Sequence, residues 1–130
     1  MNKSRILIVD DDQNLSDLVR FFLNKTQRFE VCVENRAAHA VAAALNFQPD
    51  LVLLDVDMPG KDGGAVAAEM GEEPTLGDTQ IIFLTSMVSR SEAGESLVTR
   101  GGLRFLAKPV NPKALIETLD RVLQVVATAA

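Results

Sequence analysis

The stretch from Leu51 to Gly63, LVLLDVDMPGKDG, constrains the fold more than any other part of the sequence. Its first four residues are apolar without alternation, which is typical of a strand buried on both faces of a parallel sheet. The apolar run stops at Asp55, and the Pro59-Gly60 pair that follows predicts a tight loop. Asp55 therefore lies where a buried strand meets a loop, which is the edge at which open α/β sheets bind ligands.

The rest of the chain repeats this alternation of strands and helical segments. Apolar runs at 6–9 and 81–84 predict two further buried strands, the alternating segment 29–34 predicts a strand at the sheet edge, and 103–107 predicts the last strand. A segment that favours a helix follows each strand. Five such β-α units predict an α/β fold: a doubly wound, parallel, five-stranded sheet with helices on both faces.

Polar residues and glycines predict where several of these helices begin and end. One of the acids at 11–12 is expected to cap the first helix. The capping-box pattern Ser89-x-x-Glu92 is expected to open the fourth helix, which would include Val98 and end at the glycines 101–102. Because this helix also carries an interior glycine, which costs about 1 kcal/mol relative to alanine, we expect its stability to be marginal.

Charge and composition exclude several classes of partner. The net charge of −5 argues against binding nucleic acid through its phosphates, which requires a clustered basic surface. No apolar run approaches the roughly 18 residues of a membrane span, so we expect no membrane interaction. The single cysteine, Cys32, cannot form an internal disulfide, which favours a cytoplasmic location.

Polar side chains follow four of the predicted strands where the apolar runs stop: Asp10 and Asp11, Asp55, Thr85 and Lys108. Because the carboxyl ends of parallel strands share one edge, these groups are expected to lie together. Clustered carboxylates at a partly open site suit Mg²⁺. A carboxylate can attack phosphorus to give an aspartyl phosphate, and Mg²⁺, Lys108 and Thr85 would stabilise the charge on the phosphoryl oxygens.

Along nearly its full length the sequence resembles the receiver domains of two-component response regulators, the CheY-like superfamily. The matching pieces, in order, are ILIVDDD at 6–12, LVLLDVDMPGKDG at 51–63, IIFLTS at 81–86 and FLAKP at 105–109. The resemblance implies the flavodoxin-like strand order 2-1-3-4-5. It also implies one receiver domain over residues 1–130, with its core at 3–127 and no output domain in this chain.

The resemblance implies a role for each residue that matches a family motif. Asp55 is similar to the phosphoacceptor. Asp10 and Asp11 resemble the acidic pair that holds Mg²⁺ or Mn²⁺, and the backbone carbonyl of Asp57 is expected to be a further ligand. Lys108 would pair with a phosphoryl oxygen.

Further positions of the motifs are implied to control switching. Thr85 would bind another phosphoryl oxygen after Asp55 is modified, and Phe105 falls at the position of the switch aromatic. Asp57 and Met87 border the expected phosphoryl group and are expected to set its lifetime. The Lys108-Pro109 peptide bond is expected to be cis, an option specific to proline.

The implied function is a phosphorylation switch, not a turnover enzyme. A sensor histidine kinase or a His-phosphotransfer protein would donate the phosphoryl group to Asp55 with Mg²⁺ present. The surface formed by the fourth helix, the fifth strand and the fifth helix would then change. That surface would bind a downstream protein or the regulator's own output domain, or another copy of the chain in a homodimer. The sequence fits both a stand-alone regulator and the N-terminal receiver of a larger one.

Two other functions remain as alternatives. The first is a phosphatase or mutase of the haloacid dehalogenase type, because Asp55-Val56-Asp57 matches the Asp-x-Asp pattern of that nucleophile. That family, however, places the motif after its first strand, follows it with Thr or Val, and needs a cap domain. The second is an interaction module that is never phosphorylated, which would have no affinity for Mg²⁺ and no response to phosphodonors.

Overall fold

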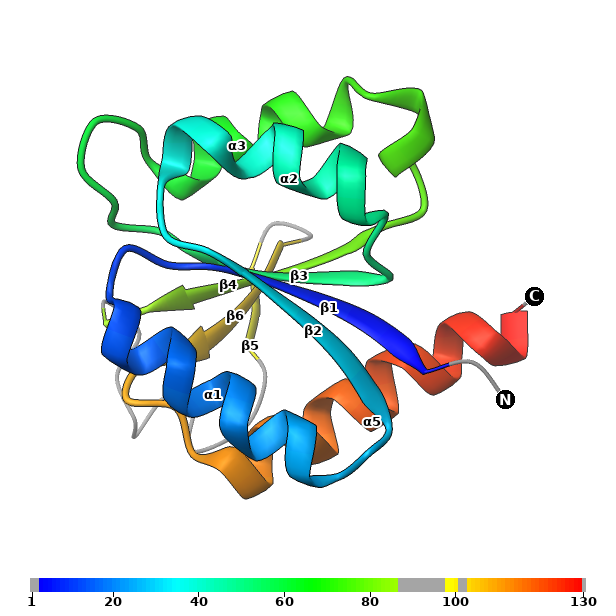
Figure 1. Ribbon diagram of the computed structural model, residues 1–130. Coiled ribbons are helices and arrows are strands. Elements are labelled where there is room, and N and C mark those ends of the chain that lie inside the picture. The colour runs from blue at the N-terminus through cyan, green and yellow to red at the C-terminus, as the bar shows by residue number, and fades with distance from the viewer. Residues whose placement is uncertain (1–2, 87–97, 101–102, 130) are drawn as a thin grey trace.

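The computed structural model describes residues 3–86, 98–100 and 103–129. A central sheet forms the middle layer, with α2 and α3 on one face and α1 and α5 on the other (Figure 1). The strands are β1 (Ser4–Val9), β2 (Phe29–Glu34), β3 (Leu51–Asp55), β4 (Gln80–Thr85), β5 (Val98–Arg100) and β6 (Leu103–Ala107). The helices are α1 (Gln13–Lys25), α2 (Ala40–Phe47), α3 (Gly63–Gly71) and α5 (Pro112–Ala129), with 3₁₀ turns at Ala37–His39 and Pro74–Leu76.

The strand order is β2-β1-β3-β4-β6-β5. The first five of these strands are parallel to their neighbours, so the predicted order 2-1-3-4-5 is confirmed, with β6 as the fifth parallel strand. The predicted edge position of β2 is also confirmed. Because these five strands are parallel, their carboxyl ends all lie at one edge of the sheet.

The sheet has a sixth strand that was not predicted from the sequence. β5 pairs antiparallel with β6, in the register Val98↔Phe105. The expectation that Val98 belongs to the fourth helix was therefore wrong. Val98 and Thr99 are β-branched and favour a strand, and the outer edge of β6 offers backbone groups for pairing. The rest of that expected helix, residues 89–97, lies outside the described residues.

Side chains of the central strands alternate between two apolar cores, one on each face of the sheet. Ile6, Ile8 and Leu53 belong to the core under α1 and α5. Leu7 and Leu54 belong to the core under α2 and α3. Every residue of β3 is buried, which explains its unbroken apolar run and confirms the expectation for Leu51 to Leu54.

Side-chain caps start three helices at the edge that carries the strands' carboxyl ends. Asp12 Oδ1 accepts from the Leu15 amide at 3.1 Å and caps α1. Asn111 Oδ1 accepts from the Ala114 amide at 3.0 Å, just before α5 begins at Pro112, and Asp62 caps α3 in the same way. Each cap fixes the loop between a strand end and the next helix, and these loops carry the candidate site. Within the described part of the chain, no helix is long and apolar enough to cross a membrane.

Candidate functional site

Three charged side chains from three strand ends meet at the carboxyl edge of the sheet. Asp10 follows β1, Asp55 ends β3, and Lys108 follows β6. Lys108 Nζ lies 2.9 Å from Asp10 Oδ2 and 3.1 Å from Asp55 Oδ1. Asp10 is 0% exposed and Asp55 is 3% exposed, so one ammonium offsets only part of the charge of two buried carboxylates. Segments far apart in the sequence therefore form a single charged cluster.

The cluster has the oxygen ligand atoms that a hard cation requires. Asp10, Asp11 and Asp55 each offer one carboxylate oxygen, and these oxygens lie within 4.8 Å of one another. Asp10 Oδ2 is buried and has no well-directed hydrogen bond among the described residues, although Lys108 Nζ is near it. Asp11 is exposed, which keeps one side of the cluster open. An all-carboxylate set with one open side fits Mg²⁺ or Mn²⁺.

Backbone amides orient the two buried carboxylates. The Asp12 amide donates to Asp10 Oδ1 at 2.9 Å. The Asp57 amide donates to Asp55 Oδ1 at 3.3 Å. Each carboxylate thus accepts a hydrogen bond from the loop that follows its own strand, which limits its rotation.

The loop after Asp55 returns tightly against its own strand. Gly60 has a φ of +81°, which glycine adopts at little cost. The Gly63 amide donates to Val56 O at 2.9 Å, and a Cβ on Gly63 would lie 2.4 Å from Asp55 O. This contact explains the final glycine of the LVLLDVDMPGKDG stretch, because any side chain there would displace the Asp55 backbone.

Burial and the neighbouring charges shift the pKa values of both Asp55 and Lys108. Burial is the main cause that raises the pKa of Asp55 from 3.8 to about 6. The Lys108 hydrogen bond lowers this pKa, and the Asp10 charge raises it further. Burial also disfavours the Lys108 ammonium, but its bonds to Asp10 and Asp55 outweigh that effect and raise the lysine pKa. At neutral pH Lys108 is therefore charged and most of Asp55 is ionised.

The other predicted site residues lie at or near the cluster. Thr85 ends β4 with 3% exposure, and its carbonyl accepts from the Lys108 amide at 2.9 Å. Phe105 is half-buried and stacks on Phe83, with ring centroids 5.4 Å apart. The Lys108-Pro109 bond is cis. Asp57 is exposed beside the cluster.

Three further residues bear on the site: Met87, which was predicted, and Asn35 and Ser16, which were not. Met87 lies outside the described residues. Asn35 donates to the Asp10 carbonyl and to Ser16 Oγ, and neither Asn35 nor Ser16 was predicted from the sequence. Helical spacing could have indicated Ser16, which stands three and seven residues before the buried Val19 and Leu23. Asn35 had no comparable signal beyond its place directly after β2.

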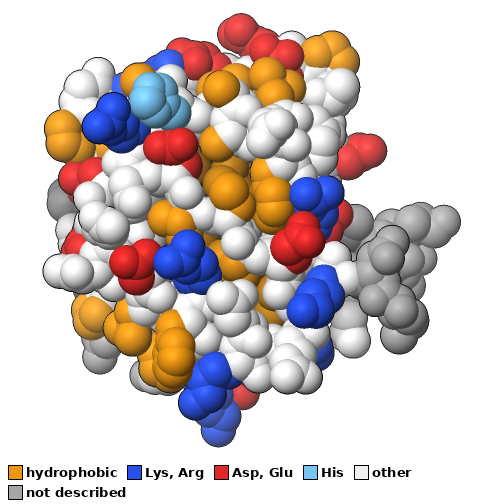
Figure 2. Space-filling model, in the orientation of Figure 1, with side chains coloured by type: hydrophobic (Ala, Val, Ile, Leu, Met, Phe, Trp, Pro, Cys, Tyr) orange, Lys and Arg blue, Asp and Glu red, His pale blue; other side chains and the backbone are white. Residues whose placement is uncertain are grey.

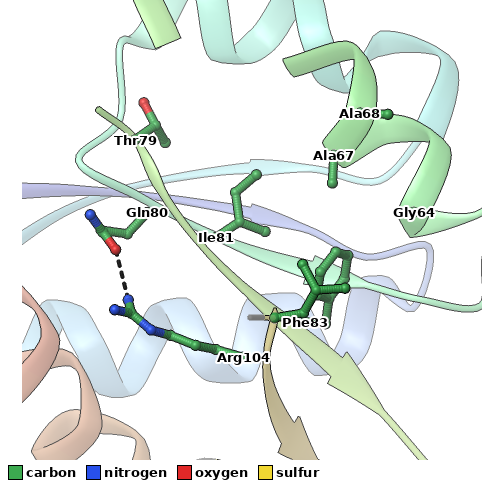
Figure 3. Close-up of a pocket in the computed structure, with 9 residues that line it drawn as sticks. Gly64, Ala67, Ala68, Thr79, Gln80, Ile81, Phe83 and Arg104 are labelled. Atoms are coloured by element: carbon green, nitrogen blue, oxygen red, sulfur yellow. Dashed lines mark hydrogen bonds between the residues drawn. The ribbon is translucent and has the colours of Figure 1, made fainter. Parts of the chain in front are cut away.

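A cavity of about 530 Å³ lies apart from this cluster, between α3, β4 and β6. Small and apolar residues form much of its lining, among them Ala67, Ala68 and Ile81 (Figure 3). Its charged member, Arg104, donates from Nη1 to Gln80 Oε1 at 2.7 Å. None of the clustered carboxylates lines this cavity, so the cavity is separate from the candidate site at Asp55.

Charged side chains of both signs share the face that Figure 2 shows. On the face that Figure 2 shows, Lys and Arg side chains are interspersed with Asp and Glu, without a continuous basic patch. Hydrophobic side chains gather on this face over α1, where Leu18 and Phe21 are both more than half exposed.

Comparisons with known proteins agree on one family. The family model described as "Response regulator receiver domain" matches residues 6–120. Protein PetR of Rhodobacter capsulatus is 33% identical over 119 residues, which are 92% of this chain and 48% of PetR. Response regulator PleD of Caulobacter vibrioides is 32% identical over 108 residues, which are 83% of this chain and 23% of PleD. This chain therefore spans less than half the length of either relative.

Solved structures show the same architecture. The chemotaxis protein CheY4 of Vibrio cholerae superposes with a TM-score of 0.78 at 27% identity, covering 93% of this chain and 99% of that one. A putative response regulator of Chloroflexus aurantiacus gives a TM-score of 0.78 at 25% identity, covering 95% of this chain and 99% of that one. Both likenesses extend over nearly the whole chain.

Proposed function

Because this chain belongs to the response regulator receiver domain family, we propose that it acts as a phosphorylation-dependent switch in which Asp55 accepts a phosphoryl group. Receiver domains are signalling switches and not classical enzymes. One observation carries the assignment: Lys108 Nζ contacts both Asp10 and Asp55 within the acidic cluster. A structural ion pair needs one carboxylate, whereas three carboxylates with one ammonium suit a site built for a cation and an incoming phosphoryl group.

In the proposed transfer an Asp55 carboxylate oxygen attacks the phosphorus of a phosphohistidine. A P–O bond forms while the P–N bond breaks, and the imidazole nitrogen leaves with the electron pair. The attack requires the ionised carboxylate, which a pKa of about 6 leaves as the main form at pH 7. The phosphodonor would be a sensor histidine kinase or a His-phosphotransfer protein.

Asp10, Asp11 and Asp55 would hold Mg²⁺ or Mn²⁺, with the backbone carbonyl of Asp57 as a further ligand. The bound ion supplies positive charge that offsets the repulsion among the carboxylates and the charge on the phosphoryl oxygens. The short spacing of the three carboxylate oxygens supports this set of ligands.

Lys108 and Thr85 would respond to the new phosphoryl group. The Lys108 ammonium would transfer its ion pair from Asp55 to a phosphoryl oxygen, and the Thr85 hydroxyl would bind another. Because the Thr85 carbonyl accepts from the Lys108 amide, the two residues would move together. Phe105, two positions after the start of β6, would carry this change to the surface.

We extend the proposal to partners and location. The changed surface would bind a downstream protein, an output domain of the same regulator or a second copy of this chain. Asp57 and Met87 would tune the lifetime of the phosphoryl group. The single receiver domain would work in the cytoplasm, where its kinase would reach it.

The test is intact-mass spectrometry after incubation with acetyl phosphate, with and without Mg²⁺. We expect one phosphoryl adduct on the wild-type chain that requires Mg²⁺ and is lost in Asp55→Asn. Asp57→Asn, which changes an exposed acid two residues away, should keep the adduct. An adduct that persists in Asp55→Asn would contradict the assignment of the acceptor.

The same samples separate the alternatives. An interaction module that is never phosphorylated predicts no adduct and no response to Mg²⁺. A phosphatase or mutase predicts turnover of acetyl phosphate far in excess of the protein. A stoichiometric adduct with slow decay would contradict both.

A further inference from the structure

We infer that Asn35 is a positioning residue for the proposed phosphorylation site, because it fixes the turn that carries Asp10 and Asp11. This inference rests on the proposed function. It adds a residue that touches neither the cation nor the phosphoryl group. Asn35 directly follows the edge strand β2 and is half-buried.

The side-chain amide of Asn35 bridges two elements. Asn35 Nδ2 donates to Asp10 O at 2.7 Å and to Ser16 Oγ at 2.9 Å. The first bond holds the end of β1, and the second holds the first turn of α1. Both N–H donors of one amide are therefore used to fix the distance between the strand end and the helix start.

Ser16, which accepts from Asn35, is a polar residue at a fully buried position of α1. Ser16 is 0% exposed in a helix whose other fully enclosed residues are apolar. Its hydroxyl lies 3.1 Å from Asp12 O and 3.1 Å from Gln13 O, so it bonds back to the preceding turn. A buried hydroxyl lowers stability unless it is hydrogen-bonded, and here it links Asn35 to the backbone of Asp12.

The turn is held at several points. The Asp10 amide donates to Glu34 O at 3.2 Å, and the Asp10 carbonyl accepts from Asn35, so both backbone groups of Asp10 bind to the end of β2. Glu34 Oε2 in turn accepts from the Arg36 amide at 3.0 Å, which fixes the backbone around Asn35. The orientation of the Asp10 carboxylate thus depends on the neighbouring edge strand.

The consequence concerns metal affinity more than folding. Two carboxylates from one turn bind a cation well only when their spacing is set in advance. Partners that orient ligands typically change metal affinity by about 10- to 100-fold when they are mutated. We expect Asn35→Ala to weaken Mg²⁺ binding by about tenfold, and Ser16→Ala, which keeps the bond to Asp10, to weaken it less.

The experiment is a Mg²⁺ titration followed by the NMR shifts of the Asp11 and Asp12 amides, together with the rate of adduct formation from acetyl phosphate at saturating Mg²⁺. Val122→Ala serves as the matched control, because Val122 is buried in the later half of α5 and its loss destabilises the fold without touching the turn. We expect Val122→Ala to bind Mg²⁺ with the wild-type affinity and Asn35→Ala to bind it about tenfold more weakly.

A charge variant separates positioning from electrostatics. Asn35→Asp adds a negative charge near the cluster, which by charge alone would tighten Mg²⁺ binding, but it removes the donors to Asp10 and Ser16. If Asn35 acts by positioning the turn, Asn35→Asp should bind Mg²⁺ more weakly than wild type does. Wild-type or tighter binding in both Asn35 variants would overturn the inference. If the wild-type chain itself bound no Mg²⁺ and formed no adduct, the proposed function would fail instead.

Discussion

At the scale of single residues, Asp55 is kept reactive at some cost in stability. Its carboxylate is almost fully buried beside a second buried carboxylate, and among the described residues the Lys108 ammonium is the cation that pairs with both. Burial therefore raises the pKa of Asp55 to about 6. A carboxyl group that holds its proton more tightly in the folded chain than in the unfolded chain favours folding only while it is protonated.

We predict that Asp55→Asn stabilises the metal-free protein at neutral pH. The contribution of Asp55 to stability is fully present below about pH 4 and is lost as the pH rises through about 6, so wild type weakens over this range and the variant does not. Urea unfolding in EDTA should show Asp55→Asn more stable by about 1–3 kcal/mol at pH 7.5 and equal to wild type near pH 4.

The exposed Asp57 provides the control for this effect. Asp57→Asn should change the free energy of unfolding by less than about 0.5 kcal/mol at either pH. A destabilised Asp55→Asn at pH 7.5 would show that the bond to Lys108 outweighs burial.

We predict that Gly63→Ala damages the site while Gly71→Ala does not. Both glycines lie in α3, but a Cβ at 63 would lie 2.4 Å from Asp55 O, whereas a Cβ at 71 meets nothing within 4 Å. Backbone cannot yield as a flexible side chain does, so Gly63→Ala should cost about 1–3 kcal/mol of unfolding free energy. It should also slow adduct formation, and equal behaviour of the two variants would refute the close contact.

At the scale of elements, the sequence was most informative where burial is two-sided. The apolar runs of β1, β3 and β4 have no other good explanation, so these strands could be predicted, whereas their order came from the family resemblance. A cap at residue 11 or 12 followed from the place of these acids before an amphipathic stretch, and the structure assigns it to Asp12. Position in a parallel sheet then brought Asp10, Asp55 and Lys108 to one edge without any knowledge of distances.

Elements that depend on pairing or on single hydrogen bonds could not be predicted in this way. β5 is three residues long, and only its partner β6 makes it a strand. Asn35 acts through two hydrogen bonds to other elements, which no local pattern encodes. The tight approach of Gly63 to Asp55 likewise depends on how the loop returns.

We predict that the α1 cap contributes to stability through its oxygen and not through its charge. Asp12 Oδ1 accepts from the Leu15 amide, and an asparagine oxygen can accept the same bond. Asp12→Ala should cost about 1 kcal/mol in urea unfolding, and Asp12→Asn should cost much less. Equal losses in the two variants would assign the effect to charge at the helix start.

At the scale of the whole molecule, the doubly wound sheet concentrates its acids at one edge. The net charge of −5 is modest, but three carboxylates share one small volume there. Folding thus brings Asp55 close to Asp10 and Asp11, which lie far from it along the chain. A cation that binds only the folded arrangement must therefore stabilise the entire fold.

We predict that Mg²⁺ stabilises this protein in a way that depends on Asp10 and on pH. At a Mg²⁺ concentration of 100 times Kd, the free energy of unfolding should rise by about 2.7 kcal/mol at pH 7.5. At pH 5, where a pKa of about 6 leaves Asp55 mostly protonated, the same Mg²⁺ should bind about tenfold more weakly and add only about 1.4 kcal/mol.

Urea unfolding with NaCl at matched ionic strength separates binding from screening. Asp10→Asn should lose most of the Mg²⁺ increment, because it removes a buried ligand oxygen. If NaCl stabilised the chain as much as Mg²⁺, or if Asp10→Asn kept the full increment, the cluster would not be a cation site.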